Sequence, residues 1–184
     1  MTPTDTVALA VTTLHTKVSD AMAKLAAALA LVLACAGVAS AYPSFWASEY
    51  APSCTAVPTA GKACHKAPMM DARTVVSLVP AAGGAPVKTA CAGKAYTVKI
   101  SFPEARLAYL TLSGGAVTVK NALNSAKCPN TFTFAAPTGF SPSRTFSTSA
   151  VAPASGSWVV SVASATGGCA PFMITRATVP VARC

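Results

Sequence analysis

The residues best equipped for chemistry stand together in the stretch CTAVPTAGKACHKAPMM, residues 54–70. It holds two cysteines, one histidine and two methionines. Imidazole nitrogen and thioether sulfur both bind copper, and thioethers suit Cu(I) in particular. The candidate metal ligands are therefore His65, Met69 and Met70. We prefer a simpler interpretation, in which an exposed histidine stands beside a disulfide and the methionines open the first strand.

The remainder of the chain supplies few partners for a catalytic or metal site. Beyond residue 41 His65 is the one histidine, and the acids are Glu49, Asp71 and Glu104. A blue-copper site requires two histidines and a free cysteine, and a catalytic zinc site commonly requires several histidines or carboxylates. Hydrolysis would depend on His65 with Asp71, or on two of the three acids flanking a sugar bond. We expect each acid to be a surface counter-ion, and we expect no enzyme and no cofactor.

The N-terminus carries the features of a secretory signal peptide. From Met22 the chain reads MAKLAAALALVLACAGVASA, which is a lysine, an apolar run over 25–38 and the small residues 39–41 that favour cleavage. The apolar run is shorter than the roughly 20 residues that span a bilayer. We therefore predict that residues 1–41 are an extension and a cleaved leader, and that 42–184 form one secreted domain without a membrane anchor. Met1 and Met22 both remain candidates for the true start.

The cysteine count fits secretion. Six cysteines lie beyond the leader, and an even number behind a signal peptide predicts three disulfides. Spacing leaves the connectivity open, with a weak preference for a local bridge between Cys54 and Cys64. The six residues are Cys54, Cys64, Cys91, Cys128, Cys169 and Cys184.

Short runs of β-branched and aromatic residues, bounded by Pro, Gly and Ser, predict an all-β fold: a single antiparallel β-sandwich of about eight strands. Alternation places Tyr96, Val98, Ile100 and Phe102 on one face and Lys99 on the other. The glycines of LSGGAV, residues 112–117, predict a tight hairpin. The expected strands cover 74–79, 95–102, 106–112, 116–120, 131–134, 144–151, 157–164 and 172–179.

The charge of the predicted domain is strongly positive, with twelve Lys and Arg against three Asp and Glu. Outside a cell such an excess favours acidic or sulfated polysaccharides or an extracellular protein over nucleic acid. A basic patch on adjacent strands is the predicted contact surface, although scattered solvating charges are the simpler alternative. The patch would contain Lys94, Lys99, Arg106 and Lys120. The aromatic residues of YPSFWASEY, 42–50, would either stack on a ligand or, as we prefer, pack onto the sandwich.

Several residues give the chain a resemblance to the reeler family of extracellular β-sandwich domains. They are YPS at 42–44, Cys54 followed by Pro58 and His65, the strand AGKAYTVKIS at 92–101, and the late cysteines. The resemblance covers most of residues 42–184. It implies a secreted adhesion or matrix module and carries over no catalytic residues.

The sequence thus predicts a secreted, non-catalytic binding or structural module of the extracellular matrix, cell wall or cell surface, which recognises an anionic glycan or protein. A small secreted carbohydrate-active enzyme or hydrolase is the alternative, and a copper-binding secreted protein is a further one. The sequence does not specify the oligomeric state.

Overall fold

The computed structural model describes residues 53–62, 64–118, 130–133, 141–167 and 169–184, together with Met22, Lys24, Trp46 and Cys128. The chain divides into two compact units, Met1–Ala39 and Ser40–Cys184. Most of the predicted leader lies outside the described residues, so its cleavage remains a prediction. Within the described part of the chain, no helix is both long and apolar enough to cross a membrane.

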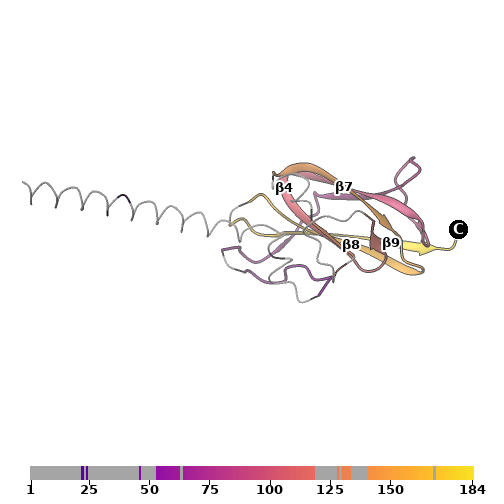
Figure 1. The fold of residues 1–184 in the computed structure, drawn as a ribbon, viewed down its shortest axis with the longest axis horizontal. Coiled ribbons are helices and arrows are strands. Elements are labelled where there is room, and N and C mark those ends of the chain that lie inside the picture. Colours follow the sequence, from indigo (N-terminus) through magenta and orange to yellow (C-terminus); the bar gives the residue numbers. More distant parts are fainter. Residues whose placement is uncertain are drawn as a thin grey trace, which may run out of the picture. The chain divides into compact units, whose positions relative to one another are not determined.

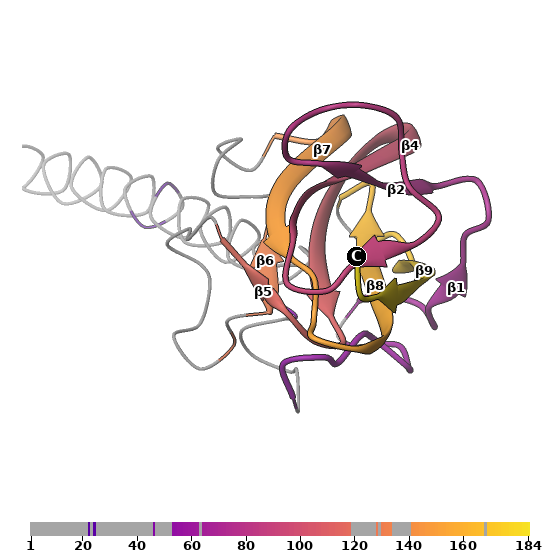
Figure 2. The same cartoon turned by 90° about the vertical axis from the view of Figure 1, so that its right-hand side faces the viewer.

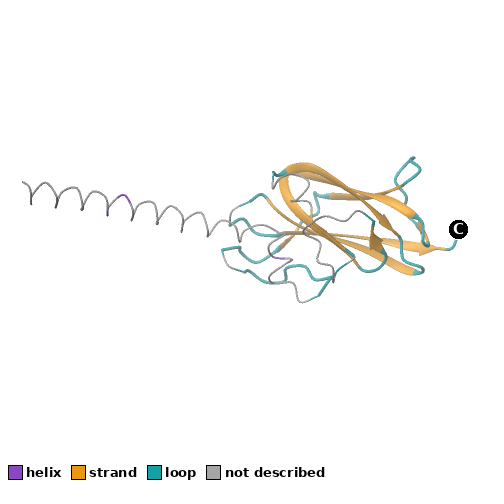
Figure 3. Cartoon of the chain, in the orientation of Figure 1, coloured by secondary structure: helices purple, strands orange, loops and turns teal. Residues whose placement is uncertain are grey.

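The second unit contains nine strands among its described residues (Figures 1 and 3). The prediction of an all-β sandwich is confirmed. The predicted strands 95–102 and 106–112 are one long strand, and two strands of two residues each were not predicted. In chain order the strands are β1 (Met69–Met70), β2 (Val75–Pro80), β3 (Ala90–Cys91), β4 (Ala95–Leu112), β5 (Ala116–Val117), β6 (Thr131–Thr133), β7 (Ser143–Val151), β8 (Gly156–Ala165) and β9 (Met173–Ala182).

Strand β4 belongs to both layers of the sandwich. Its first half pairs with β2 and β7, and its second half pairs with β6 and β8. The pairing with β7 is irregular between Ser101 and Arg106. Pro103 lies in this interval, and since proline has no N–H to donate, it interrupts the ladder where the strand passes from one layer to the other. The first layer is completed by β5 beside β7, and the second by β9 beside β8.

The hairpin predicted at 112–117 is wrong, because β5 pairs with β7 in the first layer and not with β4. Both edges of β4 are already occupied at its end. Leu112 faces Val160 of β8, and its N–H donates to the carbonyl of Asn130. The turn through Gly115, at φ 74°, therefore carries the chain across to the other layer.

The main core lies between the two layers. The alternation predicted for β4 is confirmed, since Tyr96, Val98, Ile100 and Phe102 are all buried in it. Trp158 of β8 is completely buried in the same core. Opposite the core, Lys99 is exposed on the outer face of the first layer.

A second, smaller core covers the outer face of the second layer. Residues 53–62, here called the strap, cross this face and bury Val57 against it. The Tyr109 hydroxyl donates to the carbonyl of Ala56 at 2.8 Å, and Thr131 Oγ1 donates to the carbonyl of Cys54 at 2.8 Å. Burial raises the pKa of Tyr109, which keeps its hydroxyl protonated as a donor. The buried members of this core are Trp46, Val57, Tyr109, Ala163, Ala165, Phe172 and Ile174.

Three disulfides are present, as predicted, but the preferred local bridge is wrong. The pairs are Cys54–Cys128, Cys64–Cys169 and Cys91–Cys184. Because the strap extends across the sheet, Cys54 and Cys64 are anchored to different segments of the chain. The bridges span 74, 105 and 93 residues, and long loops of this kind restrict the unfolded chain most strongly.

Candidate functional site

Arg106 is not a surface residue, which corrects its assignment to the basic patch. Its side chain is completely buried, and its Nη1 lies 2.6 Å from Asp71 Oδ2 while its Nη2 lies 2.9 Å from Glu104 Oε1. The guanidinium also lies 5.7 Å from the centre of the Phe102 ring. Arg106 therefore ties the bend of β4 to the segment between β1 and β2.

Asp71 is buried as well, so its predicted role as a surface counter-ion is wrong. Burial alone would raise the pKa of this carboxyl. The hydrogen bonds from Thr74 Oγ1 and the Arg73 backbone N–H, with the hydrogen bond and charge of Arg106, outweigh that effect and hold the pKa of Asp71 below its usual value. The carboxylate thus stays ionised next to its buried cation.

These contacts weaken both hydrolytic alternatives. Asp71 and Glu104 bind the same guanidinium, so they do not flank an open cleft as a pair of glycosidase carboxylates would. His65 has other partners than Asp71. Its Nδ1 bonds to the carbonyl of Ala170, and its ring stacks on Phe172 at 4.1 Å.

The expectation of an exposed His65 is wrong, because the residue is only 5% exposed. The neighbouring Cys64–Cys169 bridge holds the segment against residues 170–172, which cover the ring. Met69 and Met70 are 54% and 71% exposed on β1. Successive side chains of a strand point to opposite faces, so the two thioethers do not converge on one site with His65. In the described part of the chain, no three His, Cys, Asp or Glu side chains gather as a metal site would require.

The remaining members of the predicted basic patch have different positions. Lys99 lies in the middle of the first layer, between Ser77 of β2 and Ser147 of β7. Lys94 precedes the start of β4, and five residues of strand separate it from Lys99 by about 16 Å. Lys120 lies outside the described residues. Arg106 is excluded from the predicted basic patch. That Lys94, Lys99 and Lys120 form one patch stays a prediction.

The structure joins the segment that carries Lys88 and Lys94 to the segment that carries Arg183, a connection that the sequence did not show. Strand β3 pairs with the end of β9, and the Cys91–Cys184 bridge closes the same end of the sandwich. Lys88 and Lys94 each lie three residues from Cys91, and Arg183 precedes Cys184. All three side chains are exposed. We call this group, Lys88, Lys94 and Arg183, the basic end.

Backbone hydrogen bonds fix the segments that carry the basic end (Figure 2, around the C-terminus). The N–H of Ala92 donates to the carbonyl of Ala182 at 2.8 Å, and the N–H of Lys94 donates to that of Cys91 at 3.1 Å. The hydroxyl of Tyr96 accepts the N–H of Cys91 at 2.6 Å. In the sequence, each of these bases lies close to a cysteine. This closeness connects the three bases only once Cys91 is known to pair with Cys184.

No protein-family model matches this chain, and no curated protein matches it. Among solved structures, the Reelin-N domain of F-spondin matches with 11% identity and a TM-score of 0.48 over 67% of this chain and 93% of that one. Two structures of the human F-spondin reeler domain match with 11% and 12% identity and TM-scores of 0.45, over 61% and 67% of this chain and 94% and 95% of theirs. Reeler domains are the family to which the sequence resemblance pointed.

Proposed function

We propose that this protein is a secreted, non-catalytic binding module of the extracellular matrix, cell wall or cell surface, and that it holds an anionic polysaccharide at its basic end. The observation that carries the proposal is that three exposed bases, Lys88, Lys94 and Arg183, lie within three residues of Cys91 or Cys184, in two segments that the bridge joins. Their segments come from distant parts of the chain and are fixed by that bridge.

Secretion is supported by the disulfides, which a reducing compartment does not maintain. Three disulfides join the described cysteines, and such bridges persist in oxidising environments. The leader predicted over residues 1–41 agrees with this assignment.

The distribution of charge favours an anionic ligand at the basic end. Both described acids, Asp71 and Glu104, are engaged by Arg106 at the bend of β4. None of the described carboxylate side chains forms an ion pair with Lys88, Lys94 or Arg183. Exposed cations that pair with none of the described carboxylate side chains can attract a repeating polyanion, whose successive charges meet several of them at once.

A linear polysaccharide fits this surface better than a small ion. Single exposed ion pairs contribute only about 0–1 kcal/mol, so affinity requires several contacts made together. Binding of this kind weakens as salt screens the charges, and it strengthens with the length of the ligand.

The test is binding to immobilised sulfated, carboxylated and neutral polysaccharides across a salt series. We expect retention on the two anionic matrices, loss of retention as salt rises, and no retention on the neutral one. Equal retention on neutral and anionic matrices, or retention that salt does not change, would overturn the proposal.

A further inference from the structure

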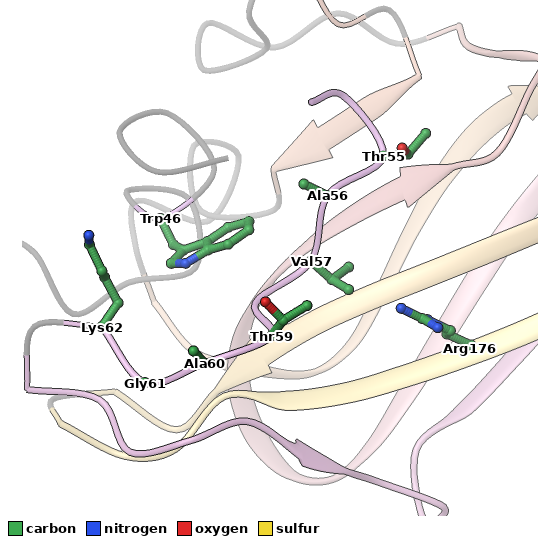
Figure 4. A pocket seen from close by; sticks show the side chains of 9 residues that line it. All are labelled: Trp46, Thr55, Ala56, Val57, Thr59, Ala60, Gly61, Lys62 and Arg176. Carbon is green, nitrogen blue, oxygen red and sulfur yellow. The ribbon is translucent and has the colours of Figure 1, made fainter. Parts of the chain in front are cut away.

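A cavity lies between the strap and the outer face of the second layer, away from the residues of the basic end (Figure 4). Its volume is about 470 Å³, which is within the range of small-molecule sites. The strap contributes one wall with Ala56, Val57 and Thr59, and Trp46 contributes another. Arg176 of β9 completes it from the sheet.

Disulfides restrain the strap on both sides, at Cys54 within it and at Cys64 two residues beyond its end. Cys54 is bound to Cys128, and Cys64 is bound to Cys169. Around Cys64 the chain turns tightly, with the N–H of His65 donating to the carbonyl of Lys62 at 3.0 Å. A Cβ on Gly61 would lie 2.8 Å from the carbonyl oxygen of His65, so this turn has no space for a side chain. A preformed site loses little entropy when a ligand binds.

Trp46 gives the cavity an aromatic, apolar wall. Its indole stacks on Tyr109 with ring centres 5.9 Å apart and meets the edge of Phe172 at 6.4 Å. The side chain is therefore held in place by the second core, which confirms packing as the preferred role of this aromatic residue. Ala56 and Val57 continue the apolar surface on the strap.

Two bases line the cavity, Arg176 and Lys62, and the Lys62 side chain points away from Arg176 in Figure 4. Arg176 lies on the same face of β9 as Ile174, which packs in the second core with Val57 of the strap. The guanidinium of Arg176 extends toward the strap in Figure 4. Its side chain is exposed, and none of the described carboxylates pairs with it. Among the described residues that line the cavity there is no acid. The cavity thus combines apolar walls with a planar cation suited to a carboxylate.

We propose that this cavity binds a small organic anion with an apolar body, the apolar part lying against Trp46 and Val57 and the carboxylate meeting Arg176. The proposal is independent of polysaccharide binding at the basic end. Sulfate or phosphate esters are other anions that the guanidinium can bind, and they serve as comparison ligands in the test.

Trp46 supplies a direct readout. The sequence has two tryptophans, and Trp158 is completely buried in the main core, away from the cavity. The probes are 4-phenylbutyrate, its neutral amide and phenyl phosphate, titrated into the secreted protein while tryptophan fluorescence is followed. A Trp46→Phe variant assigns the signal to Trp46.

We expect 4-phenylbutyrate to change the fluorescence saturably and to bind about tenfold more tightly than the amide, which corresponds to about 1.4 kcal/mol, because only the carboxylate adds its negative charge to the hydrogen bonds that Arg176 can make with either ligand. Arg176→Gln should abolish that preference, whereas Arg144→Gln, which removes an exposed base from β7, should retain it. Ala60→Phe should fill the cavity and eliminate binding of both ligands while leaving Arg176 unchanged.

Three results would overturn the proposal: equal affinities for acid and amide in the unmodified protein, unchanged acid affinity in Arg176→Gln, or no saturable change at millimolar 4-phenylbutyrate. Tighter binding of phenyl phosphate than of the carboxylate would overturn the assignment of the carboxylate class. If the unmodified protein bound 4-phenylbutyrate as expected but did not bind anionic polysaccharides, only the function proposed for the basic end would be refuted.

Discussion

Asp71 Oδ2 and Arg106 Nη1 lie 2.6 Å apart in the interior of the protein, where the Asp71 side chain is 2% exposed and that of Arg106 is 0% exposed. Two residues that the sequence had assigned to the surface thus form a buried ion pair. Its contacts connect the bend of β4 with the turn that leads into β2, and so they help to hold the two layers together.

Asp71→Asn should destabilise the protein strongly. The substitution leaves the buried Arg106 without its nearest counter-ion, and breaking a buried pair in this way costs about 3–5 kcal/mol. Chemical denaturation monitored by circular dichroism measures the change in the free energy of unfolding. Glu104→Gln is the matched control, because the Glu104 side chain is 53% exposed and its loss should cost about 1 kcal/mol or less. Equal effects of the two substitutions would contradict this account of the pair.

The same pair predicts how stability depends on pH. The folded-state pKa of Asp71 is lowered, so its contribution is fully present above the unfolded value of 3.8 and is lost as pH falls through the folded-state pKa. Below about pH 4 the free energy of unfolding should therefore decline more steeply in the native protein than in Asp71→Asn. Unfolding curves at a series of acidic pH values test this. Parallel pH profiles for the two proteins would count against it.

Non-reducing peptide mapping should recover three cross-linked peptide pairs: Cys54 with Cys128, Cys64 with Cys169, and Cys91 with Cys184. Removing the Cys91–Cys184 bridge by a double substitution to Ser should cost about 2–5 kcal/mol of stability and weaken polysaccharide binding, because Arg183 is then held less firmly beside Lys94. Removing Cys64–Cys169 is the control, which should cost similar stability without that loss of binding. A recovered Cys54–Cys64 peptide would disprove the arrangement of the strap.

The positions of the longer strands were predictable because alternation and turn residues mark them locally. The strands β1 and β3 have two residues each, too few to show a period, and they form only because β9 offers them its free edge. The disulfide pairing was not predictable either, since spacing alone does not show that the strap crosses a sheet.

The burial of Arg106 did leave a signal in the sequence. From Tyr96 to Phe102 the even-numbered residues of β4 face the core, and from Ala108 to Leu112 they do so again. Continuing the same alternation through the bend places Arg106 inside. It was missed because two separate strands were predicted, 95–102 and 106–112, and the alternation was not continued across residues 103–105. The basic end was missed for another reason, since it depends on contacts between segments about 90 residues apart, such as the 93-residue Cys91–Cys184 separation.

We propose that the position of the bases, and not net charge alone, makes the basic end a polysaccharide-binding surface. Two triple variants with the same change in charge separate these explanations. One is Lys88→Gln, Lys94→Gln and Arg183→Gln. The other is Lys66→Gln, Lys99→Gln and Arg144→Gln, which removes three exposed bases from other parts of the domain.

The deciding measurement is the dissociation constant of each variant for one sulfated polysaccharide at physiological salt. We expect the first variant to bind about tenfold more weakly or worse, since each base near an anionic surface contributes about 1 kcal/mol, and the second to remain close to the unmodified protein. Equal losses in the two variants would contradict the claim, as would unchanged binding in the first.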